Sequence, residues 1–214
     1  MHDIEDLVEG YHRFFSTRDS EKTQLYNQLA ERGQTPRTMV ISCCDSRVDP
    51  SAIFDAGPGS LFVVRNVANL VPPFEPTGDF HGTSAALEYA VGALHVENIV
   101  VMGHARCGGV KAFIDGMYKK RTAELGFIDS WMSLLNPAKA RLPEISVVED
   151  DDEYQRLLEL DSVRCSIQNL MTFPFVRCAV AEGTLRLRGA YFSIFHGSLL
   201  GMDPDDGEFY PVDC

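Results

Sequence analysis

The sequence lacks any apolar run long enough to cross a lipid bilayer. Its best apolar run, residues 99–102 (IVVM), ends after a handful of positions, whereas a membrane-spanning helix needs about 20. Positive charge is also scarce. Against 31 Asp and Glu there are only 19 Lys and Arg, which gives a net charge of -12. Such a surface repels phosphate groups, so we expect neither a nucleic-acid partner nor a membrane partner.

The first residues lack the basic charge of a secretory or transit peptide. Residues 1–6 (MHDIED) are acidic, and on this basis we expect a cytoplasmic protein. Six cysteines in 214 residues, without an export signal, are more typical of thiols or metal ligands than of a disulfide framework. No Gly- or Ser-rich linker and no internal repeat divides the chain. With 45% apolar residues, residues 1–214 fit a single domain.

The N-terminal residues predict a helical arm ahead of the core. Apolar side chains recur there at helical spacing on a charged background: Ile4, Leu7, Val8, Tyr11, Phe14 and Phe15. A second helical stretch ends at Gly33 in a polar turn. We therefore expect an arm over residues 1–32 and an α/β core over residues 34–214. The apolar face of the arm needs a partner, which predicts self-association as a dimer or a dimer of dimers.

Short apolar and β-branched segments predict buried strands over residues 38–43, 61–64 and 98–102. A helix expected over residues 83–94, with Thr83 as its N-cap, separates the last two. Strand, helix and strand in this order predict an α/β fold with a mostly parallel central sheet flanked by helices.

The second half of the chain carries mostly helical signals and one late strand. An interrupted helix is expected over residues 109–135, an irregular acidic segment over 143–153, helices over 157–170 and from Pro174, a late strand over 190–195, and a polar tail after Gly201.

Cysteine and histidine residues lie at the expected ends of two strands. Cys43 ends the strand over 38–43, His104 follows the strand over 98–102, and Cys107 comes three residues later. The carboxyl ends of parallel strands share the sheet edge where α/β folds bind ligands. Thiolate and imidazole suit zinc, so Cys43, His104 and Cys107 predict a zinc site with one ion per subunit. From the pattern alone, Cys44 could replace Cys43 or join it in a closed four-ligand site.

Asp45 and Arg47 follow the first cysteine pair at a spacing that favours an ion pair in extended backbone. On a surface such a pair contributes little. Beside a metal ligand, the carboxylate can accept a proton or hydrogen bond from a metal-bound water while the guanidinium holds it in place. We therefore interpret Asp45 and Arg47 as catalytic.

Four linked motifs resemble the β-class carbonic anhydrases. They are Cys-x-Asp-Ser-Arg from Cys43, residues 62–73 (FVVRNVANLVPP), residues 88–91 (EYAV) and Gly-His-x-x-Cys-Gly-Gly from Gly103. Order and spacing agree with that family from about Gln34 to Lys111, and weaker similarity continues over residues 169–176. The resemblance implies reversible hydration of carbon dioxide to bicarbonate and a proton, by zinc-bound hydroxide hydrogen-bonded to Asp45. It also implies Cys43 rather than Cys44 as the ligand.

The resemblance extends to a plant-like, open-site branch of the family. It implies a carbon dioxide pocket formed by Gln34, Phe62, Val67, Tyr89 and the N–H of Gly108, part of which reaches a zinc site at the subunit boundary. In a closed, inactive state known in another branch, Asp45 would itself bind zinc. That branch has a bicarbonate site built from a tryptophan, an arginine and a tyrosine. The tryptophan position here is Val40 and the arginine is Arg65, so we expect no such inhibition.

Two other functions are weighed against the enzyme. A zinc-stabilised scaffold that only binds a partner would be indicated by loss of Asp45 or Arg47, and both are present. A cysteine-based redox or sulfur enzyme would use Cys44. For the proton shuttle, His81, Tyr89 and buffer all stay open. Arg106, inside the metal-binding loop, either steers an anion or faces solvent.

Overall fold

The computed structural model describes residues 3–77, 81–116, 126–148 and 150–212, and it divides into two compact units, residues 1–35 and 36–214. The first unit holds α1 (Ile4–Ser16) and α2 (Ser20–Arg32). Asp3 and Asp6 form a capping box that begins α1. The apolar stripe predicted for this helix is confirmed, and its six side chains are exposed.

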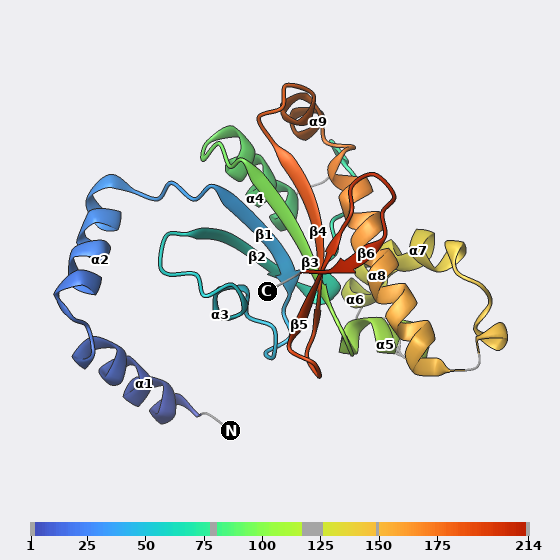
Figure 1. The fold of residues 1–214 in the computed structure, drawn as a ribbon, viewed down its shortest axis with the longest axis horizontal. Coiled ribbons are helices and arrows are strands. Elements are labelled where there is room, and N and C mark those ends of the chain that lie inside the picture. Colours follow the sequence, from blue (N-terminus) through green and yellow to red (C-terminus); the bar gives the residue numbers. More distant parts are fainter. Residues whose placement is uncertain (1–2, 78–80, 117–125, 149, 213–214) are drawn as a thin grey trace. The chain divides into compact units, whose positions relative to one another are not determined.

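The second unit is built on a six-stranded mixed sheet of order β2-β1-β3-β4-β5-β6 (Figure 1). The strands are β1 (Thr38–Cys43), β2 (Leu61–Asn66), β3 (Asn98–His104), β4 (Arg186–Ser193), β5 (Ser198–Met202) and β6 (Phe209–Pro211). The pairs among β1 to β4 are parallel, as predicted, and the last two pairs are antiparallel. The polar tail expected after Gly201 therefore contains a further strand, because Phe209 and Tyr210 of β6 pair with Met202 and Gly201 of β5.

The helices of this unit, in chain order, are α3 (Pro50–Ile53), α4 (Gly82–Gly92), α5 (Gly108–Ile114), α6 (Phe127–Met132), α7 (Asn136–Arg141), α8 (Asp151–Leu170) and α9 (Pro174–Ala181). Short 3₁₀ turns are η1 (Val67–Asn69), η3 (Ser133–Leu135) and η4 (Ile145–Val147). In the described part of the chain, no helix is both long and apolar enough to span a membrane.

Different helices pack against the two faces of the sheet. Met39 and Ile41 of β1 point to the face that packs against α4, α8 and α9. Val40, between them, points to the other face, into a smaller cluster that includes Ile53 of α3. This alternation is expected of a strand whose successive side chains point to opposite faces.

Two sequence-based expectations need correction, and a third is made more precise. The helix after β2 begins at Gly82 with His81 as N-cap, because the hydroxyl of Thr83 instead accepts a hydrogen bond from Asn66. The acidic segment is not irregular throughout, because its last residues begin α8. Asp150 caps this helix, and the acidic side chains of the first turn are stabilised by the positive end of the helix dipole. The interrupted helix predicted over 109–135 is α5, α6 and η3, and its residues 117–125 lie outside the described part.

Glycine at the end of β3 brings α8 close to the sheet edge. A Cβ atom on Gly103 would lie 2.7 Å from a methyl carbon of Val163 on α8, far inside normal contact distance. Tyr191 of β4 borders the same position. The middle of α8 therefore lies directly beside the residue that precedes His104.

Candidate metal centre

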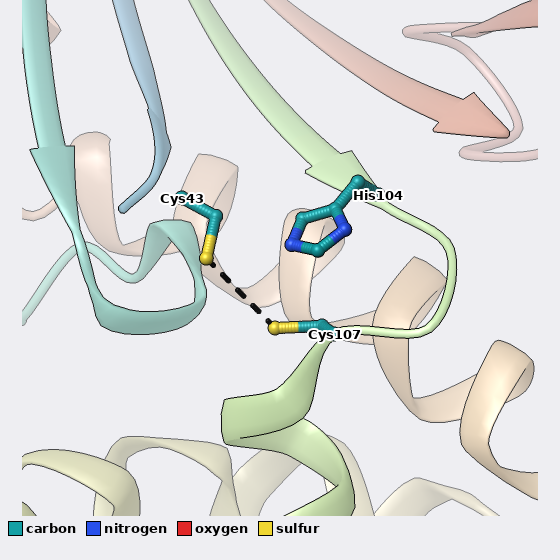
Figure 2. A group of neighbouring side chains, drawn as sticks. All are labelled: Cys43, His104 and Cys107. Atoms are coloured by element: carbon teal, nitrogen blue, oxygen red, sulfur yellow. Dashed lines mark hydrogen bonds between the residues drawn. The ribbon is translucent and has the colours of Figure 1, made fainter. Parts of the chain in front are cut away.

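Cys43, His104 and Cys107 meet at the carboxyl edge of the sheet. Cys43 is the last residue of β1, His104 the last of β3, and Cys107 the N-cap of α5 (Figure 2). One ligand atom from each lies within 4.8 Å of the others, and all three residues are buried. The two sulfur atoms are 3.9 Å apart. The sequence predicted this juxtaposition from the strand ends.

The donor set fits a metal ion. Nδ1 of His104 lies 2.9 Å from the carbonyl of Ala105, which fixes the proton on Nδ1 and leaves the lone pair on Nε2. Nε2 is buried and has no hydrogen-bond partner among the described residues, a costly state for a polar atom unless a ligand occupies it. Two cysteines and one histidine form a three-ligand set typical of catalytic zinc.

The two thiols perturb each other. A hydrogen bond from Cys107 lowers the pKa of Cys43 to about 4. The same contact, together with burial, raises the pKa of Cys107. The protein alone therefore favours one thiolate and one thiol. A divalent cation between the two sulfurs would favour the thiolate form of both.

Arg65 of β2 holds the segment that follows Cys43 in place by hydrogen bonds. Its guanidinium donates to the carbonyls of Cys43 (2.9 Å) and Asp45 (2.6 Å) and to the carboxylate of Asp49 (3.0 Å). Asp49 also caps α3. One arginine thus fixes both the metal-ligand end of β1 and the turn after it.

Asp45 and Arg47 form a bidentate ion pair on this segment. Nε of Arg47 lies 2.9 Å from Oδ1 of Asp45 and Nη2 lies 2.6 Å from Oδ2. The guanidinium holds the pKa of Asp45 well below its usual range. Nη2 of Arg47 also donates to the carbonyl of Arg106, 3.0 Å away. The ion pair thereby spans the two segments that carry the cysteines.

The sequence left the role of Arg106 open between anion steering and solvent exposure. In the structure its side chain forms an ion pair with Asp152 at the first turn of α8. Its backbone adopts a left-handed conformation, with φ of 57°. This turn is what presents the Arg106 carbonyl to Arg47.

The predicted pocket residues fall in three places. Val67 and Gly108 lie beside the cysteines, since Val67 packs in the same cluster as Cys43 and Cys107, and Gly108 follows Cys107 in α5. Phe62 and Tyr89 contact each other, with ring centroids 5.9 Å apart. Phe62 pairs with Met39, four residues before Cys43, or roughly 13 Å back along the strand. Gln34 is an exposed residue of the first unit, after α2.

A cavity of about 600 Å³ opens beside Val67. Its walls are mainly apolar and include Pro72, Phe127, Ile128 and Trp131, with Cys44 and His81 among the polar positions. Trp131 donates its indole N–H to the carbonyl of Val67, 2.8 Å away, which fixes this wall. Cys44 is exposed, has a free thiol and is not part of the cysteine–histidine group.

Sequence reasoning missed the polar side chains that hold Cys107 from behind. Glu159 and Gln155 of α8 and Tyr191 of β4 are buried around its main chain. Burial raises the pKa of Glu159, although its three hydrogen bonds oppose that effect. The available signal was a carboxylate and an amide one helical turn apart on α8, but Arg156 and Asp161 in the same stretch gave it the pattern of a solvated helix.

This arrangement defines a class of protein: an α/β enzyme with a cysteine-rich metal centre at the carboxyl edge of parallel strands and an aspartate–arginine pair beside it. A sequence profile of the carbonic anhydrase family matches residues 38–199. The chain is 36% identical over 195 residues to beta carbonic anhydrase 3 of Arabidopsis thaliana, covering 91% of this chain and 75% of that protein. It belongs to the β-class carbonic anhydrases.

Solved structures agree with this membership. The β-carbonic anhydrase CcaA superposes with a TM-score of 0.84 at 28% identity, covering 99% of this chain and 92% of that one. A tetrameric β-carbonic anhydrase from Sordaria macrospora gives 0.78 at 28% identity, covering 97% and 95%. Enzymes of this family are lyases that use zinc, and Cys43, His104 and Cys107 are the group that could hold the ion.

Proposed function

We propose that this chain hydrates carbon dioxide reversibly to bicarbonate and a proton, with Cys43, His104 and Cys107 as zinc ligands and Asp45 and Arg47 as the catalytic pair. The observation that carries the proposal is the bidentate Asp45–Arg47 ion pair next to the buried ligand group. Zinc analysis of the purified protein beside a stopped-flow assay of carbon dioxide hydration tests it. A protein that contains zinc but has no hydration activity would favour the alternative function, a zinc-stabilised scaffold that only binds a partner.

When bound, zinc activates a water molecule as the nucleophile, less strongly than in a three-histidine site because two thiolates neutralise its charge. Asp45 is the acceptor that receives a hydrogen bond from the nucleophile. Arg47 lowers the pKa of this carboxylate and fixes its direction. The mainly apolar cavity beside Val67 suits carbon dioxide, which is itself apolar.

The open-site, plant-like assignment rests on the contacts of Asp45. Its carboxylate faces Arg47 and is not one of the three residues of the ligand group in the described part of the chain. We therefore propose Asp45 as a hydrogen-bond acceptor in the working state and not as a fourth zinc ligand. For a proton shuttle within one chain, the cavity favours His81, which lines it, over Tyr89, whose ring lies against Phe62 at a tilt. The cytoplasmic location stays a prediction.

We expect the rate to rise with pH through and above neutrality. The weaker activation of water by a two-thiolate zinc site is the reason. Asp45 is not the group that titrates, because its pKa lies well below its usual range and the carboxylate stays ionised throughout. A profile of kcat from mildly acidic to alkaline pH checks this. A flat profile would contradict the proposed nucleophile.

We expect simple product inhibition by bicarbonate and no sigmoidal inhibition. The donors of Arg65 already bind Cys43, Asp45 and Asp49, and Val40 is buried in an apolar cluster and offers no donor. Few hydrogen-bond donors therefore remain at this position to bind a second anion. A titration of the rate with bicarbonate checks this, and a sigmoidal response would place the chain in the other branch.

We further propose that Phe62 and Tyr89 serve the site of a second copy, in a dimer or a dimer of dimers. Within one chain, Phe62 lies four residues back from Cys43 along the paired strands. The exposed apolar face of α1 and the tetrameric relative from Sordaria macrospora support self-association. The enzyme would then be incomplete as a monomer.

Mixed dimers test this arrangement. Co-expression of Cys107→Ser with Tyr89→Ala should restore activity, because the zinc site of the Tyr89→Ala chain would receive an intact Tyr89 from its partner. With equal mixing, about a quarter of the wild-type sites should be complete. The control mixes Cys107→Ser with Cys43→Ser and should restore nothing. If the mixed dimers recover no more activity than this control, Tyr89 acts within its own chain; if Tyr89→Ala alone keeps wild-type activity, Tyr89 has no role at the site.

A further inference from the structure

A buried carboxylate on α8 has no part in the mechanism above. Glu159 is 2% exposed, and both of its oxygens are occupied. Oε1 accepts hydrogen bonds from the main-chain N–H of Cys107 (2.8 Å) and from the side chain of Gln155 (2.7 Å). Oε2 accepts one from the hydroxyl of Tyr191 (2.7 Å). Three donors from three different segments therefore converge on one side chain.

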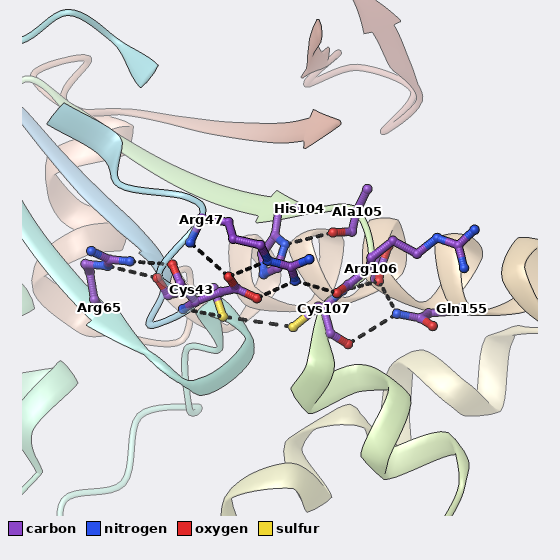
Figure 3. A network of polar contacts seen from close by, with 10 residues as sticks. Cys43, Arg47, Arg65, His104, Ala105, Arg106, Cys107 and Gln155 are labelled. Atoms are coloured by element: carbon purple, nitrogen blue, oxygen red, sulfur yellow. Dashed lines mark hydrogen bonds and ion pairs between the residues drawn. The ribbon is translucent and has the colours of Figure 1, made fainter. Parts of the chain in front are cut away.

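This network holds Cys107 at both of its main-chain groups. Glu159 accepts a hydrogen bond from its N–H. The amide of Gln155 donates to its carbonyl, 3.2 Å away (Figure 3). Cys107 is the N-cap of α5, where the main-chain N–H has no partner within the helix. The direction of its Cα–Cβ bond, and hence the position of its sulfur, is set by these contacts with α8.

The location of the Glu159 carboxylate indicates a function beyond packing. Burying a carboxylate is expensive unless its hydrogen bonds compensate for the lost water, and here it lies behind a pair of thiols. An apolar residue at this position would fill the same space and leave the N–H of Cys107 without an acceptor. Groups that hold a metal ligand in this way commonly change metal affinity or activity by 10–100-fold when replaced.

We infer that Glu159 is a positioning residue of the zinc site, which fixes the main chain of Cys107 so that its sulfur faces Cys43 and His104. This inference rests on the proposed function, since it takes these three residues as the zinc ligands. Gln155 supports the same function from one helical turn away, and Tyr191 holds the far oxygen of the carboxylate.

Two substitutions separate acceptor position from charge. Glu159→Asp keeps the charge but withdraws the acceptor from Cys107 by one methylene group. Glu159→Gln removes the charge but keeps an oxygen for the N–H of Cys107 and an NH₂ group that can donate to the hydroxyl of Tyr191. A positioning role predicts that the Asp variant binds zinc roughly 10–100-fold more weakly, and that the Gln variant stays close to the wild type.

Zinc affinity is measured by chelator competition, and ligand geometry by the absorption spectrum of the cobalt-substituted protein. Glu153→Asp is the matched control, since Glu153 lies on the same helix and pairs with Arg156. It should change neither readout. Should Glu159→Asp fail to fold, Gln155→Ala removes a hydrogen bond from both Glu159 and Cys107 and should weaken zinc binding several-fold.

The outcomes are distinct. Wild-type zinc affinity and an unchanged cobalt spectrum in Glu159→Asp or, where that variant does not fold, in Gln155→Ala would overturn the inference. A loss in Glu159→Gln as large as that in Glu159→Asp would also overturn it, because the charge would then matter as much as the position of the acceptor. If the wild type binds zinc but hydrates no carbon dioxide, the proposed function fails while the affinity series still decides the role of Glu159.

Discussion

Replacing Cys107 with serine is expected to abolish stoichiometric zinc binding and to lower carbon dioxide hydration by more than about 100-fold, beyond the loss typical of removing a neighbour of a ligand. A serine hydroxyl is a poor zinc ligand at neutral pH, because it does not ionise as a thiol does. The remaining Cys43 and His104 cannot complete a three-ligand site. Cys43→Ser should behave in the same way, since its sulfur lies 3.9 Å from that of Cys107.

Metal analysis of the purified variants and the stopped-flow assay measure both effects. Cys178→Ser is the matched control, because it exchanges an exposed free thiol on α9 for the same hydroxyl. It should keep zinc and activity. Zinc should also raise the unfolding temperature of the wild type, because the ion binds only the folded site, and this shift should vanish in Cys107→Ser. Full zinc content and activity in either ligand variant would contradict the assignment.

The sequence allowed the ligand group to be predicted because its geometry follows from strand order. Cys43 and His104 end adjacent parallel strands, and such strands must bring their carboxyl ends to one edge. Spacing of three residues then brings Cys107 within reach of His104. Alternation along the strand left open which of Cys43 and Cys44 is the ligand, and the family resemblance implied Cys43. The structure places Cys43 in the ligand group and leaves Cys44 exposed.

The support behind the site depends on packing between segments far apart in the chain. Glu159 is 52 positions from Cys107 in the sequence, and Tyr191 lies on another strand. Their approach is set by the close contact of Gly103 with α8, which no periodicity reveals. The Arg106–Asp152 ion pair was not predicted for the same reason. The sequence of the acidic segment is typical of solvated surface, whereas in the structure Asp152 lies in the first turn of α8 and contacts Arg106.

Asp45→Asn is expected to keep zinc and to lower kcat by about 100-fold or more, within the range typical of losing a proton acceptor in catalysis. The amide has the size of the carboxylate but carries no charge and turns an NH₂ group toward either the nucleophile or Arg47. The zinc ligands are untouched, so metal content should match the wild type. This combination distinguishes Asp45 from Cys107, whose loss should remove both metal and rate.

Arg47→Lys then separates the direction of the carboxylate from its ionisation. Without the bidentate contact the pKa of Asp45 should rise toward the ordinary value of about 3.9, which still leaves the group ionised at neutral pH. Any loss of rate at pH 7 must therefore come from misdirection of the carboxylate and from the lost hydrogen bond to the carbonyl of Arg106. We expect a loss of roughly 10-fold, since lysine offers a point charge instead of a planar fork.

The depressed pKa of Asp45 also sets the acid limit of this effect. Because the folded-state pKa lies below the unfolded value, the stabilising contribution of the ion pair is present above about pH 3.9 and is lost only as the pH falls toward the folded-state pKa.

Asp115→Asn, at the exposed end of α5 where Asp115 pairs with Lys111, is the control for Asp45→Asn and should leave kcat unchanged. An Asp45→Asn enzyme with wild-type kcat across pH 6–9 would show that Asp45 is not the acceptor.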